Sequence, residues 1–149
     1  MAIYGRLETS PRGGGRSRPY VRPGLLLSKV LNPITVALGR RTVLRVRGRT
    51  SGKLIRVPMD PPFEWQGVRH LVSPRGETHW ARNLRAAGEA ELQTRRSVEH
   101  VRVAELTGPE RDEVVSAYGS TITCNCRKSM ALLPDPADHP VFRIESPGR

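Results

Sequence analysis

The sequence contains only two cysteines, and this scarcity restricts its metal and disulfide chemistry. Cys124 and Cys126 are separated by one residue, and no second cysteine pair exists. A structural zinc site needs about four ligands, and the nearest histidine in the sequence, His139, lies beyond a proline-rich loop. We therefore expect no metal site. We also expect reduced thiols, because a disulfide across a single intervening residue would be strained.

Long apolar runs are also missing. No stretch of about 18 consecutive apolar residues occurs, so a spanning helix is not expected. No long apolar run follows the first basic residues, which argues against a secretory signal and for a cytoplasmic protein. Residues 24–39 read as one apolar helix, or as two short ones that restart at Pro33. We expect this segment to cover one end of the core. A peripheral contact with a membrane, or with a lipophilic substrate, is left open.

Acidic residues are almost absent from the front of the chain. Residues 1–56 contain 13 arginines and lysines against one acid, Glu8, for a net charge of +12. Residues 57–149 contain 12 basic and 13 acidic residues, for a net charge of −1. The front is therefore the part that attracts anions. Only three of the 25 basic residues are lysines, a bias typical both of bidentate phosphate or carboxylate recognition and of a GC-rich genome.

The chain is long enough for one domain with a single core. Residues 10–24, SPRGGGRSRPYVRPG, have few apolar side chains to offset the entropy of ordering. We therefore divide the chain into a flexible basic arm, residues 1–23, and one folded domain, residues 24–149.

Alternation of apolar and polar residues predicts several short strands in this domain, and helical spacing with end signals predicts two helices. The predicted strands are 42–49, 54–60, 68–73, 90–95, 98–106 and 139–146, and the predicted helices are 77–88 and 107–119. Hairpin spacing without a β-α-β rhythm indicates a mainly β (α+β) fold, an antiparallel barrel with two or three helices.

One segment, RVRGRTSGKLIRVP (residues 45–58), carries five basic residues and no acid. It is one residue too short for a Walker loop, and no G-x-G-x-x-G opens a helix elsewhere. What remains is a hairpin whose turn offers amide groups, hydroxyls and Lys53 to an anion, with Arg56 on the returning strand. Lys53 and Arg56 can reach the same anion only if a turn or bulge lies near Leu54. A solvated hairpin with ordinary surface arginines is the alternative.

Three motifs together resemble a known family. They are LRVRGRTSGKLIRVP (44–58), HLVS (70–73) and HWARNLRAAG (79–88), in this order. From about Asn32 to Ile144 the chain is similar to the deazaflavin-dependent nitroreductases, which include F420H2-dependent quinone reductases. Members are split β-barrels of the flavin-reductase/FMN-binding type, and they use coenzyme F420.

The resemblance implies which residues bind the cofactor, with FMN as the alternative to F420. F420 carries a phosphodiester and a polyglutamate tail, and the matching turn residues would hold these anionic groups: Arg49, Ser51, Gly52, Lys53 and Arg56. The strand that matches HLVS would place Val72 and Ser73 along the deazaflavin ring. In the helix, Trp80, Asn83 and Arg85 would flank the pocket. Core packing for Trp80, and a surface position for Asn83 and Arg85, are the alternatives.

The implied reaction is hydride transfer from the reduced deazaflavin to a small electron-poor acceptor, a quinone, an enone or a nitro compound. The acceptor oxygen needs a hydrogen-bond donor, and Ser73 and Tyr118 are the candidate catalytic residues. Pro74 and Arg75 follow Ser73 where family members often have a lysine, and no tyrosine follows Tyr118. The acceptor side therefore departs from the family's pattern, and the resemblance implies no particular substrate.

Two other functions are compatible with the sequence. One is a non-catalytic carrier of F420, or of a flavin-like or haem-like ligand, with the same fold. The other is a nucleic-acid-binding module, which the basic arm favours. The first half lacks the aromatic platforms that single-strand binding prefers, so we expect no nucleic-acid partner. A homodimer is left open.

Overall fold

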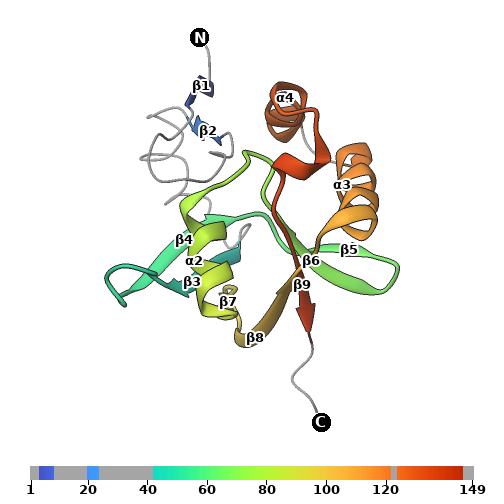
Figure 1. The fold of residues 1–149 in the computed structure, drawn as a ribbon. Helices are drawn as coiled ribbons and strands as arrows, with labels where there is room; N and C mark the ends of the chain where they lie inside the picture. The colour runs from blue at the N-terminus through green and yellow to red at the C-terminus, as the bar shows by residue number, and fades with distance from the viewer. Residues whose placement is uncertain (1–3, 9–19, 24–41, 122–123, 146–149) are drawn as a thin grey trace.

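Seven strands form one curled antiparallel sheet in the computed structural model, which describes residues 4–8, 20–23, 42–121 and 124–145 (Figure 1). In sheet order the strands are β4 (Leu54–Met59), β3 (Thr42–Arg47), β7 (Glu89–Gln93), β8 (Val98–Glu105), β9 (Val141–Glu145), β6 (Val68–Val72) and β5 (Phe63–Trp65). Each neighbouring pair is antiparallel. This half-barrel, with its helices, confirms the predicted split-barrel class.

Helix α2 (His79–Ala87) packs on the inner face of the sheet and completes the main core. Strand β3 shows why this face is apolar, since Leu44 and Val46 are fully buried while Arg47 on the other face is exposed. Trp80 and Leu84 are one helical turn apart on α2 and enter the same cluster. Burying a leucine of this kind stabilises a fold by about 1.5–3 kcal/mol.

Helix α3 (Gly108–Thr121) lies near β5 and β6, away from β3 and β4 (Figure 1), and covers a second apolar cluster. Val114 and Val115 of α3 pack there with Val141 of β9, and Phe63 of β5 lies against them. Helix α4 (Cys124–Leu132) and a short 3-10 turn, η2 (Pro136–Asp138), then lead the chain back to β9. The two clusters fix β6 and β9 between α2 on one side and α3 on the other.

The predicted elements that fall on described residues are confirmed with small changes at their ends. Each of the six predicted strands and both predicted helices is present, and α3 begins at Gly108. Strand β5 and helix α4 were not predicted. Strand β5 turns into β6 through Gln66 and Gly67, whose φ angles of 52° and 77° are those that a two-residue hairpin turn requires.

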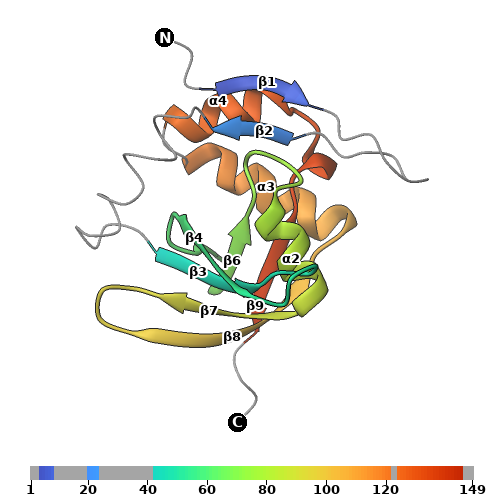
Figure 2. The same cartoon turned by 90° about the vertical axis from the view of Figure 1, so that its left-hand side faces the viewer.

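The first 23 residues contain a separate two-stranded antiparallel sheet, made of β1 (Tyr4–Glu8) and β2 (Tyr20–Pro23) (Figure 2). Tyr20 also forms an isolated bridge with Gly76, in the loop between β6 and α2. Residues 9–19 and the apolar segment 24–39 lie outside the described residues. The division into an arm and a domain therefore stays a prediction. Among the residues that the structure describes, no helix is long and apolar enough to cross a membrane.

Candidate functional site

The turn between β3 and β4, residues 48–53, has a tightly bonded backbone. Gly48 N donates to Lys53 O at 2.8 Å, and Gly52 N donates to Gly48 O at 2.9 Å. Ser51 Oγ accepts from Lys53 N at 3.2 Å. Gly52 has a φ of 69°, the left-handed region that favours glycine. Lys53 lies in the turn, before β4 begins. It therefore does not follow the alternation of side chains in the strand that carries Arg56, and a turn rather than a bulge separates the two residues.

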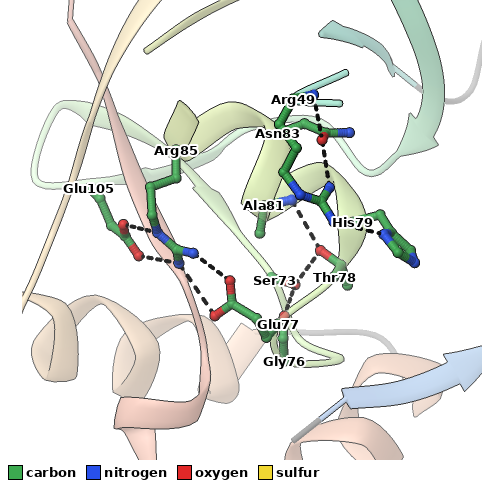
Figure 3. Close-up of polar contacts among 10 residues, drawn as sticks. All are labelled: Arg49, Ser73, Gly76, Glu77, Thr78, His79, Ala81, Asn83, Arg85 and Glu105. Atoms are coloured by element: carbon green, nitrogen blue, oxygen red, sulfur yellow. Dashed lines mark hydrogen bonds and ion pairs between the residues drawn. The ribbon is translucent and has the colours of Figure 1, made fainter. Parts of the chain in front are cut away.

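Asn83 of helix α2 holds this turn on the helix (Figure 3). Its Oδ1 accepts from Arg49 N at 3.2 Å and from Arg49 Nη1 at 2.7 Å. Arg49 Nη2 also lies 3.5 Å from Nδ1 of His79, one helical turn before Asn83. The structure thus brings together Arg49 and Asn83, two of the predicted cofactor residues, from motifs 34 residues apart.

The helix that carries Asn83 is itself well fixed. Thr78 caps its N-terminus, accepting from Ala81 N at 3.3 Å. Gly88, with a φ of 71°, ends the helix as predicted and donates its N–H to Leu84 O. A capped helix with Trp80 and Leu84 in the core is a rigid support for the exposed turn.

Four cations of the hairpin have no acidic partner among the described residues: Arg47, Arg49, Lys53 and Arg56. Arg47 Nη1 donates to the carbonyl of Gly52 at 3.0 Å, and Arg56 Nη2 donates to Gln93 Oε1 at 3.3 Å. Arg56 lies directly opposite Arg45 on the same face of the sheet, and only Arg45 is neutralised, by Glu91 at 3.0 Å. Like charges opposite one another are unfavourable. An anion bound at this hairpin would relieve that repulsion.

Ser73, the predicted ring-side serine, is fully buried and shapes the loop after β6. Its Oγ donates to Gly76 O at 2.6 Å and lies 3.2 Å from Thr78 Oγ1. The neighbouring Val72 is partly buried and packs against the cluster under α3. The hydroxyl of Ser73 is therefore engaged within its own loop, and a role as donor to a substrate stays a prediction.

Trp80 and Arg85 lie apart from the turn. Trp80 is 8% exposed and packs in the core with its ring centroid 6.2 Å from that of Phe142. Arg85 binds Glu105 and the buried Glu77, each at 2.6 Å, on a different side of α2 from Arg49 (Figure 3). Hydrogen bonds to Glu105 and then Glu77 raise the pKa of Arg85 above its usual value. Of the three predicted helix residues, only Asn83 joins the turn.

Tyr118, the second predicted donor, lies on α3 itself. Its ring packs edge-on against Phe63 at 5.4 Å. Burial, together with Cys126 and Asp60 nearby, raises the pKa of the Tyr118 hydroxyl above its usual value of 10. Among the described residues, no hydrogen bond joins Tyr118 to Ser73 or to the turn. The structure therefore places the two predicted donors in different surroundings.

Two features near Ser73 were not predicted. His139 is fully buried, with Nδ1 3.0 Å from Ser73 O and Nε2 2.7 Å from Leu133 O, so it ties the loop to the end of α4. Tyr20 of β2 lies beside the same loop, with the guanidinium of Arg75 5.9 Å from its ring centroid. The sequence gave no signal for either contact. His139 is a lone histidine in a proline-rich stretch, and Tyr20 is a tyrosine in the basic arm.

No group of His, Cys, Asp or Glu side chains that could hold a metal ion occurs within the described part of the chain. Cys126 is a partly buried free thiol with Sγ 3.8 Å from Asp60 Oδ2. The candidate site is therefore the cationic β3–β4 turn on α2, together with the loop that contains Ser73.

Solved structures share this fold. One described as an F420-H2 dependent reductase (FDR-A) is 23% identical, with a TM-score of 0.52, over 71% of this chain and 94% of its own. A second, described as a domain-swapped dimer, is 21% identical, with a TM-score of 0.52, over 79% of this chain and 92% of its own. A third, a protein of unknown function from Agrobacterium tumefaciens str. C58, is 15% identical, with a TM-score of 0.52, over 74% of this chain and 49% of its own.

No family model matches the sequence. No curated protein matches it either. At identities below 25%, the structural similarities establish the fold that the chain shares with these proteins.

Proposed function

We propose that this protein binds coenzyme F420 and catalyses hydride transfer from the reduced cofactor to a quinone, an enone or a nitro compound. The observation that carries the proposal is the β3–β4 turn, which is held on α2 by Asn83 and surrounded by cations without acidic partners in the described part of the chain. The similarity to a structure described as an F420-H2 dependent reductase supports the same cofactor.

The residues of the turn fit the anionic end of F420. Arg49, Ser51, Gly52, Lys53 and Arg56 would hold its phosphodiester and acidic tail, and hydrogen bonds that involve a charged group contribute about 1.5–3 kcal/mol each. FMN has one phosphate and no acidic tail, so it would use fewer of these cations. When bound, the deazaflavin supplies the hydride, and the protein supplies orientation and exclusion of water.

On the ring side, Val72 and Ser73 would lie along the edge of the deazaflavin. Trp80 would support helix α2 from the core. Ser73 could donate to an acceptor oxygen only if its hydroxyl left Gly76 O, to which it is bonded at 2.6 Å. Tyr118 could donate as a neutral phenol, since its raised pKa keeps the proton on the oxygen.

Titration with F420 and, separately, with FMN tests the cofactor directly, with intrinsic tryptophan fluorescence as the readout. We expect F420 to bind at micromolar concentrations and FMN to bind more weakly, because FMN lacks the tail. Absence of F420 binding in this range would overturn the proposal.

The role of the turn is tested by the double variant Lys53→Ala/Arg56→Ala. F420 affinity should fall by at least about tenfold, because charged hydrogen bonds to the anion are lost. A deazaflavin lacking the phosphodiester and tail should lose little affinity. Arg95→Ala/Arg96→Ala removes the same charge from exposed positions in the β7–β8 turn and should have little effect on either ligand. Equal losses for both ligands would show that Lys53 and Arg56 do not serve the tail.

A non-catalytic carrier of F420 is the second candidate. It is favoured by the internal hydrogen bond of the Ser73 hydroxyl and by the burial of Tyr118, since neither is an exposed donor. A tight F420 complex that reduces no quinone, enone or nitro compound would support the carrier. Turnover of any of these acceptors would exclude it.

We also infer self-association, because one similar structure is described as a domain-swapped dimer. Light scattering after size exclusion should then give about twice the chain mass of 16.6 kDa. A monomer mass at all protein concentrations would contradict the inference.

A further inference from the structure

Asn83 lies under the candidate anion site but is itself shielded from solvent. Its exposed fraction is 3%, and it lies on α2 between the cap at Thr78 and the cap at Gly88. Arg49, in contrast, is an exposed residue of the turn. A ligand that approached the turn from solvent would therefore meet Arg49 before Asn83.

The hydrogen bonds of Asn83 fix the orientation of its amide group. The main-chain N–H of Arg49 and its Nη1 both donate, at 3.2 Å and 2.7 Å, so the group that faces them must be the oxygen. A carbonyl oxygen has two lone pairs, and these two bonds use both. The oxygen of Asn83 thus holds the main chain and the side chain of the same residue.

We propose that Asn83 is a positioning residue, which sets the place of Arg49 for an anion and does not contact the anion itself. The identity of the anion as F420 rests on the proposed function. The Arg49 side chain is long, and holding it before the ligand arrives reduces the entropy lost on binding. His79 Nδ1 lies 3.5 Å from Arg49 Nη2 and so restricts the movement of the guanidinium at the nitrogen that Asn83 does not bind.

The first test needs no ligand. Amide hydrogen exchange at Arg49 should be slow in the natural protein and in Asn83→Asp, whose carboxylate can still accept both hydrogen bonds. It should be faster by at least about tenfold in Asn83→Ala, which has no acceptor. An Arg49 amide that exchanges equally fast in all three proteins would overturn the proposal, whether or not F420 binds.

The second test uses F420 affinity to distinguish positioning from contact. If Asn83 acts through Arg49, Asn83→Ala should weaken F420 by about tenfold and Asn83→Asp should weaken it less. If the amide N–H of Asn83 instead donated to the anion, the aspartate would repel the anion. Asn83→Asp would then bind F420 more weakly than Asn83→Ala. Ala86→Asp adds the same negative charge at an exposed position of α2, and it measures the effect of charge alone.

A double-mutant cycle with Arg49→Ala completes the design. In the Arg49→Ala background, Asn83→Ala should cost less than about threefold in F420 affinity, because the guanidinium that Asn83 orients is gone. A full, independent tenfold loss in that background would overturn the proposal. Should Asn83→Ala unfold, the comparison of Asn83→Asp with Ala86→Asp still decides between the two roles. Failure of the natural protein to bind F420 would instead count against the proposed function.

Discussion

Arg69 of β6 forms a two-pronged ion pair with Glu99 of β8, although β9 lies between these strands in the sheet. Arg69 Nη2 lies 2.6 Å from Glu99 Oε1, and Nη1 lies 3.0 Å from Oε2. The curl of the sheet brings the two residues together. The hydrogen bonds from Arg69 lower the pKa of Glu99 below its usual value of 4.5, against the smaller effect of desolvation.

Arg69→Ala should lower the free energy of unfolding by less than about 1 kcal/mol, because both side chains are about 40% exposed and water screens the pair. The pKa of Glu99 is lower in the folded protein, so its contribution is present above the unfolded pKa and is lost as the pH falls through the folded value. Urea unfolding at low and high salt, at neutral and acid pH, checks this. A loss that neither salt nor acid reduces would indicate packing by the arginine stem.

Arg85→Ala should destabilise the protein more than Arg69→Ala, by about 1.5–3 kcal/mol, because it removes two charged hydrogen bonds from a carboxylate in the interior. Glu77 is 6% exposed and binds Arg85 at 2.6 Å. Adding Glu77→Gln to Arg85→Ala should recover part of the loss, since the amide carries no charge to bury. Thermal and urea unfolding of the three variants measure this.

The same Arg85→Ala variant tests whether Arg85 takes part in cofactor binding. Both carboxylate partners lie on a different side of α2 from the turn (Figure 3). We therefore expect F420 affinity within about twofold of the natural protein, at a temperature where the variant is folded. A tenfold loss would instead support the role that the family resemblance implies for Arg85.

His70 should make the protein less stable in mild acid. Its side chain is 4% exposed, and its Nδ1 has no hydrogen-bond partner among the described residues. Burial lowers the pKa of His70 below its usual value of 6.5, and Arg143 opposite it adds to this. The main-chain groups of Phe63 and Val68 and the charge of Glu110 act in the other direction but do not cancel the effect of burial.

The unfolded chain therefore takes up a proton at His70 more readily than the folded one. Stability should fall as the pH drops below about 6.5 towards the folded pKa. Urea unfolding between neutral and mildly acid pH should show this slope, and His70→Gln should flatten it. His100→Gln, which removes an exposed imidazole, is the control for the loss of one histidine. An unchanged slope in His70→Gln would assign the pH dependence to other groups.

Most of the fold could be predicted because its strands and helices have local signals. Strand β3 alternates buried Leu44 and Val46 with Arg45 and Arg47, and Gly88 ends α2 where a left-handed residue is needed. Strand β5 was missed because three residues are too few to show alternation. Helix α4, CNCRKSMAL, was missed because it has no clear apolar stripe.

The separate motifs of the candidate site could be predicted from the sequence, but the contacts between them could not. The basic turn and the helix motif are each visible in the sequence, but nothing local shows that Arg49 contacts Asn83, 34 residues away. The contact between His139 and Ser73 spans 66 residues and likewise depends on tertiary packing. Sequence patterns also do not show that the Ser73 hydroxyl is bonded within its own loop.

Gly48 should matter for the anion site because of the space around it. A Cβ at this position would lie 2.9 Å from Ser51 Oγ and 3.0 Å from Ile55 Cδ1, which is too close for either to stay in place. Ser51 Oγ accepts the hydrogen bond from Lys53 N, so a displaced Ser51 would also move the lysine. Gly67, in the β5–β6 turn, has nothing within 4 Å of a Cβ but has a φ of 77°.

These two glycines allow stability and binding to be separated. Gly67→Ala should cost about 1–2 kcal/mol of stability through backbone strain, and it should leave F420 affinity unchanged. Gly48→Ala should weaken F420 by at least about fivefold, because Ser51 and Lys53 no longer meet the anion in their original geometry. Urea unfolding and F420 titration of both variants give the two quantities. If Gly48→Ala bound F420 as tightly as Gly67→Ala, the geometry of the turn would have no part in recognition.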